Sequence, residues 1–159
     1  MNKPNSLRAA LELALPEIKQ NPENLLVFID KGQIVSTQAP NFSFEYHYTL
    51  NIILLDYSKH SDTVFIPLLV WVREHQSDLL TGRADDGMSF EAELLNHHST
   101  DISITLRLTE HVVVTREADK LVARHPSEPQ LLDVTGPTGW QMFANGGEVL
   151  PVPLEIVIP

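Results

Sequence analysis

The sequence predicts an α+β fold in which two amphipathic helices pack on one face of a mostly antiparallel sheet. Two segments, about 4–19 and 62–76, carry apolar residues at helical spacing. Two others, 41–57 and 101–116, alternate apolar and polar residues as half-buried strands do. Strands in runs, broken by isolated helices, are typical of an α+β layer.

The first predicted helix runs from about Pro4 to Lys19. Pro4 suits a first helical turn, where its missing N–H is not needed. Pro16 is unfavourable inside a helix, so we expect a kink or an early stop there. The apolar stripe consists of Leu7, Ala10, Leu11, Ala14, Leu15 and Ile18.

Three strands are predicted next. Residues 25–30 and 33–37 form short strands, and Asp30-Lys31-Gly32 forms the turn between them. The strand over 41–57 gives the strongest signal. It alternates at its start and turns apolar on both faces near its end, which predicts deeper burial there.

The second helix, 62–76, begins with Asp62 as its expected N-cap. Its predicted apolar stripe is Phe65, Leu68, Leu69 and Val72, and Pro67 bends its entry. A polar loop, 81–88, follows.

Strands at 89–95 and 101–116 come next, and 120–124 pairs back as a hairpin. We therefore expect a single α+β domain over 1–125. Residues 126–159 are expected to form a proline-rich, extended C-terminal segment with a small hairpin at Asn145-Gly146-Gly147.

Composition limits the class of function. The formal net charge is −10 and no segment is basic, which argues against specific nucleic-acid binding and against docking to an anionic membrane. Cysteine is absent, so no disulfide, thiolate zinc site or iron–sulfur cluster is expected. The longest apolar run, Val64–Val72, is far shorter than the roughly 20 residues that span a bilayer.

A search for catalytic chemistry predicts no catalytic, metal or cofactor-binding residue. His97 and His98 with Asp101 form the densest histidine cluster, but neighbours in a regular strand point to opposite faces. Glu91 and Glu93 share a strand face at a separation compatible with acid–base chemistry. Nothing apolar around them indicates a raised pKa. We therefore predict a protein that is not an enzyme and has no cofactor.

Several stretches resemble the phage tail completion protein R family of contractile-tailed phages. The resemblance covers about 3–110, in an order and spacing that are specific together. Its residues are Lys3-Pro4-Asn5-Ser6-Leu7-Arg8, Asn21-Pro22, Val27-Phe28-Ile29-Asp30-Lys31-Gly32, Ser43-Phe44-Glu45, Tyr48-Thr49-Leu50-Asn51, Pro67-Leu68-Leu69, Trp71, Arg73-Glu74, Gln76, Asp78, Asp101-Ile102-Ser103-Ile104, Leu106, Leu108, Thr109 and Glu110.

The resemblance implies a structural virion protein that caps the head-proximal end of the tail tube and allows head–tail joining. It implies a tail-terminator-like fold and self-assembly into a ring, typically six-fold. The expected partners are the tube protein and head–tail connector proteins. It also places the protein in the virion tail, after assembly in the host cytoplasm.

The polar face of the sheet is the expected channel lining, formed by Glu45, His47, Thr49, Glu91, Glu93, Thr105 and Arg107. An acidic lining lets DNA pass because the lining offers few cationic side chains to replace the counterions of the DNA. The expected assembly contacts are Arg73, Arg83, Asp85 and Asp86.

Three alternatives remain open at this point. A phage assembly chaperone or neck protein would stay monomeric or bind its partner transiently. A small hydrolase would use Glu91, Glu93 or a histidine in a concave pocket. An acidic nucleic-acid mimic has only the net charge in its favour.

Overall fold

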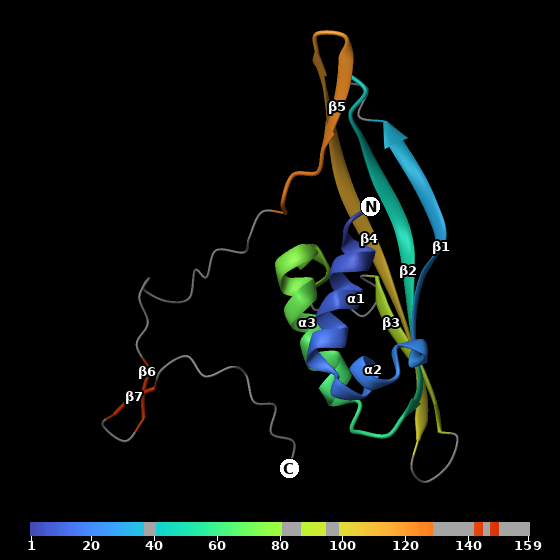
Figure 1. The fold of residues 1–159 in the computed structure, drawn as a ribbon, viewed down its shortest axis with the longest axis vertical. Coiled ribbons are helices and arrows are strands. Elements are labelled where there is room, and N and C mark those ends of the chain that lie inside the picture. The colour runs from blue at the N-terminus through green and yellow to red at the C-terminus, as the bar shows by residue number, and fades with distance from the viewer. Residues whose placement is uncertain (37–40, 81–86, 95–98, 129–141, 145–146, 150–159) are drawn as a thin grey trace.

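The computed structural model describes residues 1–36, 41–80, 87–94, 99–128, 142–144 and 147–149. Figure 1 shows one twisted sheet with the helices together on one side of it. The predicted α+β class and the mostly antiparallel sheet are therefore confirmed.

The sheet has the strand order β1-β2-β4-β3, in which every neighbour is antiparallel. A fifth strand, β5, pairs with the far end of β4 through a tight hairpin. A separate antiparallel pair consists of β6 and β7. The strands are β1 Leu25–Ser36, β2 Phe44–Tyr57, β3 Met88–Leu94, β4 Thr100–Glu117, β5 Lys120–Arg124, β6 Met142–Ala144 and β7 Gly147–Val149.

The helices are α1 Lys3–Ala14, α2 Pro16–Gln20 and α3 Asp62–His75. Two 3-10 turns, Pro22–Asn24 and Ser77–Leu80, follow α2 and α3. Alternate residues of β2 and β4 are buried and join the buried helix residues in one apolar core. Its largest fully buried side chains are Leu7, Leu11, Ile18, Leu25, Leu50, Ile52, Leu54, Ile102, Leu106, Leu108, Val64 and Val72.

The end of α1 and the start of α3 were both predicted from local sequence signals. The first helix stops early, as Pro16 predicted: Leu15 is extended and Pro16 begins α2. The predicted N-cap was wrong by one position, because Ser61 precedes α3 and Asp62 is its first residue. An acidic residue in the first turn still interacts favourably with the helix dipole.

The predicted turn at Asp30-Lys31-Gly32 was wrong. β1 runs unbroken through it, and the register against β2 shifts between Ile29 and Lys31. A bulge places one extra residue in a strand without reversing it, so Asp30 and Gly32 mark an irregularity instead of a hairpin. The strand expected from residue 41 begins at Phe44.

The predicted buried stripe of α3 was also partly wrong. Leu69 is 43% exposed, whereas Val64, Leu68, Trp71 and Val72 are buried. A helix on a sheet buries one face only, and the phase of α3 turns Leu69 outward.

Candidate assembly surfaces

All seven residues predicted to line a channel lie on the sheet face opposite the helices. The register pairs Thr49 with Arg107 and places Glu91 beside Ser103. Directly paired residues share a face, so β2, β4 and β3 contribute to one surface, here called the outer face. The seven residues are Glu45, His47, Thr49, Glu91, Glu93, Thr105 and Arg107.

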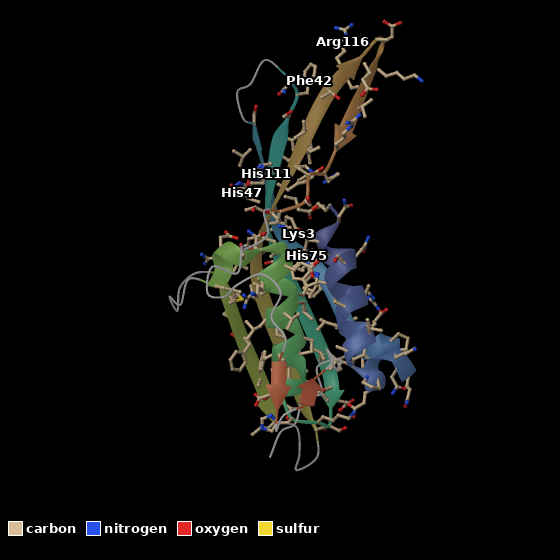
Figure 2. The ribbon with its side chains drawn as sticks, turned by 90° about the vertical axis from the view of Figure 1, so that its left-hand side faces the viewer. Lys3, Phe42, His47, His75, His111 and Arg116 are labelled. Atoms are coloured by element: carbon tan, nitrogen blue, oxygen red, sulfur yellow. The ribbon has the colours of Figure 1, made fainter. Side chains whose placement is uncertain are left out.

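Carboxylates on the outer face lie near imidazole and basic side chains. Glu45 is flanked by two imidazoles, with His47 Nε2 at 2.9 Å and His111 Nε2 at 3.4 Å. Figure 2 shows both histidines at the same level of the sheet. Lys31, which pairs with Thr49 from β1, joins Arg107 on this face. The outer face therefore carries more basic and imidazole side chains than the seven predicted lining residues alone.

The outer face ends in an apolar region that the sequence analysis had not placed there. Leu26 and Phe28 of β1 are 44% and 46% exposed. They pair with Ile53 and Asn51 of β2, which places them on the outer face beyond the polar residues.

Behind the sheet lies a buried polar cluster centred on Lys3, here called the Lys3 junction. The Lys3 ammonium is 8% exposed and has three oxygen acceptors. Each is 2.7 Å away: Gln76 Oε1, the Thr109 carbonyl and Glu128 Oε1. An ammonium has three protons to donate, so this buried cation is fully satisfied.

The Lys3 junction completes the edge of β4. β3 pairs with β4 over Thr100–Leu106, and β5 pairs with it from Val113. Between those stretches, the Thr109 N–H donates to Gln76 Oε1 at 3.1 Å and its carbonyl accepts from Lys3. The side chains of Lys3 and Gln76 therefore bond to the Thr109 N–H and C=O in place of a neighbouring strand. Buried backbone N–H and C=O groups need such partners.

A buried carboxylate holds the start of α1. Glu110, 5% exposed, accepts the Asn2 N–H at 2.7 Å and the Lys3 N–H at 3.3 Å. These are unpaired donors of a first helical turn, where negative charge is favourable. The Tyr48 hydroxyl also donates to Glu110. Burial, followed by this hydrogen bond and the nearby charge, raises the pKa of Tyr48 above its usual 10.0.

A second polar contact joins the two long helices. Trp71 Nε1 donates to Ser6 Oγ at 3.0 Å, and Ser6 Oγ lies 3.4 Å from His75 Nε2. The rings of Trp71 and His75 stack with centroids 4.5 Å apart. Lys3, Ser6 and His75 line the same pocket, so this contact and the Lys3 junction lie side by side (Figure 2).

Several residues that carry the family resemblance lie in the buried polar network. Lys3, Tyr48, Gln76, Thr109 and Glu110 belong to the stretches that carry it, and all five lie in the buried network. None of these five residues was predicted to have a role. A signal was present, because Glu110 occupies an apolar phase of β4 between Leu108 and Val112.

The remaining predicted positions are placed as follows. Arg73 is exposed on α3. Arg83, Asp85 and Asp86 lie outside the described residues. So do His97 and His98, and the part of the chain that the structure describes contains no group of three ligands that could hold a metal.

The structure also bears on the hydrolase alternative and on membrane crossing. Glu91 and Glu93 are both exposed on an edge strand, whereas catalysis needs an enclosed site. No helix among the described residues is long and apolar enough to cross a membrane.

Comparison with known proteins gives one consistent result. The family model of P2 phage tail completion protein R (GpR) matches residues 1–129. A curated relative, tail completion protein R of Escherichia phage P2, is 41% identical over 149 residues, which cover 92% of this chain and 95% of the relative. That alignment extends past residue 129, further than the recognised stretches did. No solved structure matches the chain.

Proposed function

The chain belongs to the P2 phage tail completion protein R family, and on that premise we propose that it is a structural protein of the virion tail that completes the tail during assembly. The family match over 1–129 carries this proposal. It covers the whole described α+β layer, including the Lys3 junction. The buried charges are then explained as structural supports and not as catalytic groups.

We further propose that the protein caps the head-proximal end of the tail tube as a closed ring and presents a surface to head–tail connector proteins. A ring needs two different surfaces on each copy, because a head-to-tail interface joins unlike patches. Two such surfaces support the proposal. One is the projecting β4–β5 hairpin, and the other is the outer edge of β1 over 25–35, which no other described strand than β2 pairs with.

The hairpin extends beyond the helical layer (Figure 1). Its exposed apolar residues include Val113 at 40% and Leu121 at 58%. Across the sheet, the outer edge of β1 carries Ile34 at 70% and Val35 at 40% exposure. Free strand edges offer unpaired N–H and C=O groups to another chain. We propose that the hairpin of one copy packs against β1 of the next.

The outer face is the proposed channel lining. Its carboxylates, five in number among the described strands, slightly outnumber its four cations. The carboxylates are Glu45, Glu91, Glu93, Asp101 and Glu117, and the cations are Lys31, Arg107, Lys120 and Arg124. Phosphate binding gains affinity by neutralising phosphates with clustered Lys and Arg. A surface with more acids than bases therefore gives passing DNA little to bind.

Native mass spectrometry tests the ring, with the protein alone and mixed with tail tubes made without it. We expect closed rings, either free or only on tube ends. Leu121→Glu should abolish them, whereas Thr115→Glu, at an exposed position of the same hairpin, should not. A protein that stays monomeric and ignores tube ends would contradict the proposal and favour an assembly chaperone.

A further inference from the structure

β3 is an edge strand whose second edge has no partner among the described strands. It pairs with β4 along its whole length, Met88–Leu94. About half of the backbone N–H and C=O groups of an edge strand point away from the sheet, and an extended segment of another chain can pair with them. The side chains around this edge determine which segment it accepts.

The helix side of this edge is apolar and exposed. Phe90 pairs with Ile104 of the core, so it lies on the helix side of the sheet. Phe90 is 59% exposed, and its ring centroid lies 4.8 Å from that of Phe65 of α3. Leu69 follows Phe65 by one helical turn and is 43% exposed. Phe65, Leu69 and Phe90 form an apolar surface, here called the β3 shelf, that would contact one face of an added strand.

The other side of the same edge is acidic. Glu91 and Glu93 are exposed and lie on the outer face. Their partners on β4 are Ser103 and Asp101, so no cation of β4 lies directly opposite either carboxylate. An added strand would place its own residues opposite the two glutamates. Because the glutamates are two positions apart, Lys or Arg residues at the same spacing would pair with them.

The described strands of a second copy match this edge poorly. A second β3 would set glutamates beside glutamates, because paired strands bring residues of one face together. The outer edge of β1 would bring the apolar Leu26 and Phe28 to the acidic side. The two cations of β5 already face Glu117, since Lys120 is its partner in register and Arg124 bonds to it at 3.1 Å. The matching partner is therefore a different protein.

We propose that β3 binds an extended segment of a different protein, in which apolar residues alternate with Lys or Arg. The apolar residues of that segment lie on the β3 shelf, and its basic residues pair with Glu91 and Glu93. Backbone hydrogen bonds to β3 extend the sheet by one strand. The proposed ring uses the β4–β5 hairpin and β1, so this inference rests neither on the ring nor on the tail-completion role.

Two fluorescein-labelled peptides of equal composition test the proposal with the full-length protein. The alternating peptide is Lys-Val-Lys-Val-Lys-Val-Lys. The control, Val-Val-Val-Lys-Lys-Lys-Lys, has the same charge without the alternation. Fluorescence anisotropy measures the affinity of each peptide, and hydrogen–deuterium exchange locates the binding site. We expect the alternating peptide to bind about tenfold more tightly than the control, because only its alternation suits both faces of the edge. It should slow exchange of the amides of Met88–Leu94 but not of Leu25–Ser36.

Charge reversal tests the acidic side of the edge. Glu91→Lys combined with Glu93→Lys should weaken binding of the alternating peptide about tenfold and strengthen binding of Glu-Val-Glu-Val-Glu-Val-Glu. The matched control, Glu23→Lys with Asp119→Lys, makes the same change of net charge at exposed positions outside β3. It should change both affinities far less.

Three results would overturn the proposal. The alternating and control peptides could bind equally, or exchange could slow at β1 instead of β3. Slow exchange at Met88–Leu94 in the free protein, together with a dimer in sedimentation, would show that a second copy covers this edge.

Discussion

Replacing Glu110 by glutamine tests whether the buried polar network holds the two layers together. The carboxylate accepts three donors: the backbone N–H groups of Asn2 and Lys3 and the Tyr48 hydroxyl. Glutamine keeps the shape but has one acceptor oxygen, so its NH₂ group must face at least one N–H of the first turn of α1.

The expected cost follows from these contacts. One buried donor left without a partner costs about 1–3 kcal/mol. Loss of the negative charge at the helix start costs about 0.3–1 kcal/mol more. We therefore expect Glu110→Gln to lower the free energy of unfolding by about 1.3–4 kcal/mol.

Urea unfolding followed by far-UV circular dichroism measures this change. With a slope near 2 kcal/mol per molar urea, the midpoint should fall by about 0.7–2 M. Glu91→Gln is the matched control, since Glu91 is exposed on β3, and should change stability by less than about 0.5 kcal/mol. Equal midpoints for the two variants would refute the assigned role of Glu110.

Three further predictions concern the buried tyrosines, Gly87 and Leu69. Burial raises the pKa of Tyr48 and of Tyr57 above 10.0. Their contribution to stability is therefore complete below about pH 10 and is lost as the pH rises above it. In urea titrations above about pH 10, the free energy of unfolding of Tyr48→Phe should decrease less with pH than that of the natural protein. Gly87 has φ +97°, and an added Cβ would lie 3.1 Å from Leu79 Cδ2. Gly87→Ala should therefore lower the free energy of unfolding by about 1–3 kcal/mol, which thermal unfolding measures as a lower midpoint temperature. Gly32→Ala, with its nearest contact at 3.6 Å, should lower the free energy of unfolding less. Leu69 is 43% exposed on α3, close to the exposed Ile66 and Val70, so Leu69→Asp should reduce binding of an apolar dye by the protein. Unchanged dye binding would contradict an exposed apolar face on α3.

The fold could be predicted wherever local periodicity decides the structure. β2 and β4 alternate along almost their whole length, and Pro16 marks the break between α1 and α2. The continuous β1 could not be predicted, because Asp30 and Gly32 give the same local signal for a bulge as for a turn.

The supports of the site depend on contacts between residues distant in the chain. Lys3 meets Thr109 across 106 positions and Glu110 across 107. No spacing rule links such residues before the layers are assembled. The outer face was predictable because cross-strand alternation fixes which side chains share a face, whereas the neighbouring β1 residues depended on the register.

In vitro complementation tests the proposed tail-completion role most directly. Purified protein is added to an extract of cells infected with a phage of this kind whose own tail completion gene is deleted, and infectious particles are counted. The proposed role predicts that tails join to heads and that infectivity returns, with Leu121→Glu inactive and Thr115→Glu active. An extract in which correctly folded protein leaves heads and tails separate would contradict it.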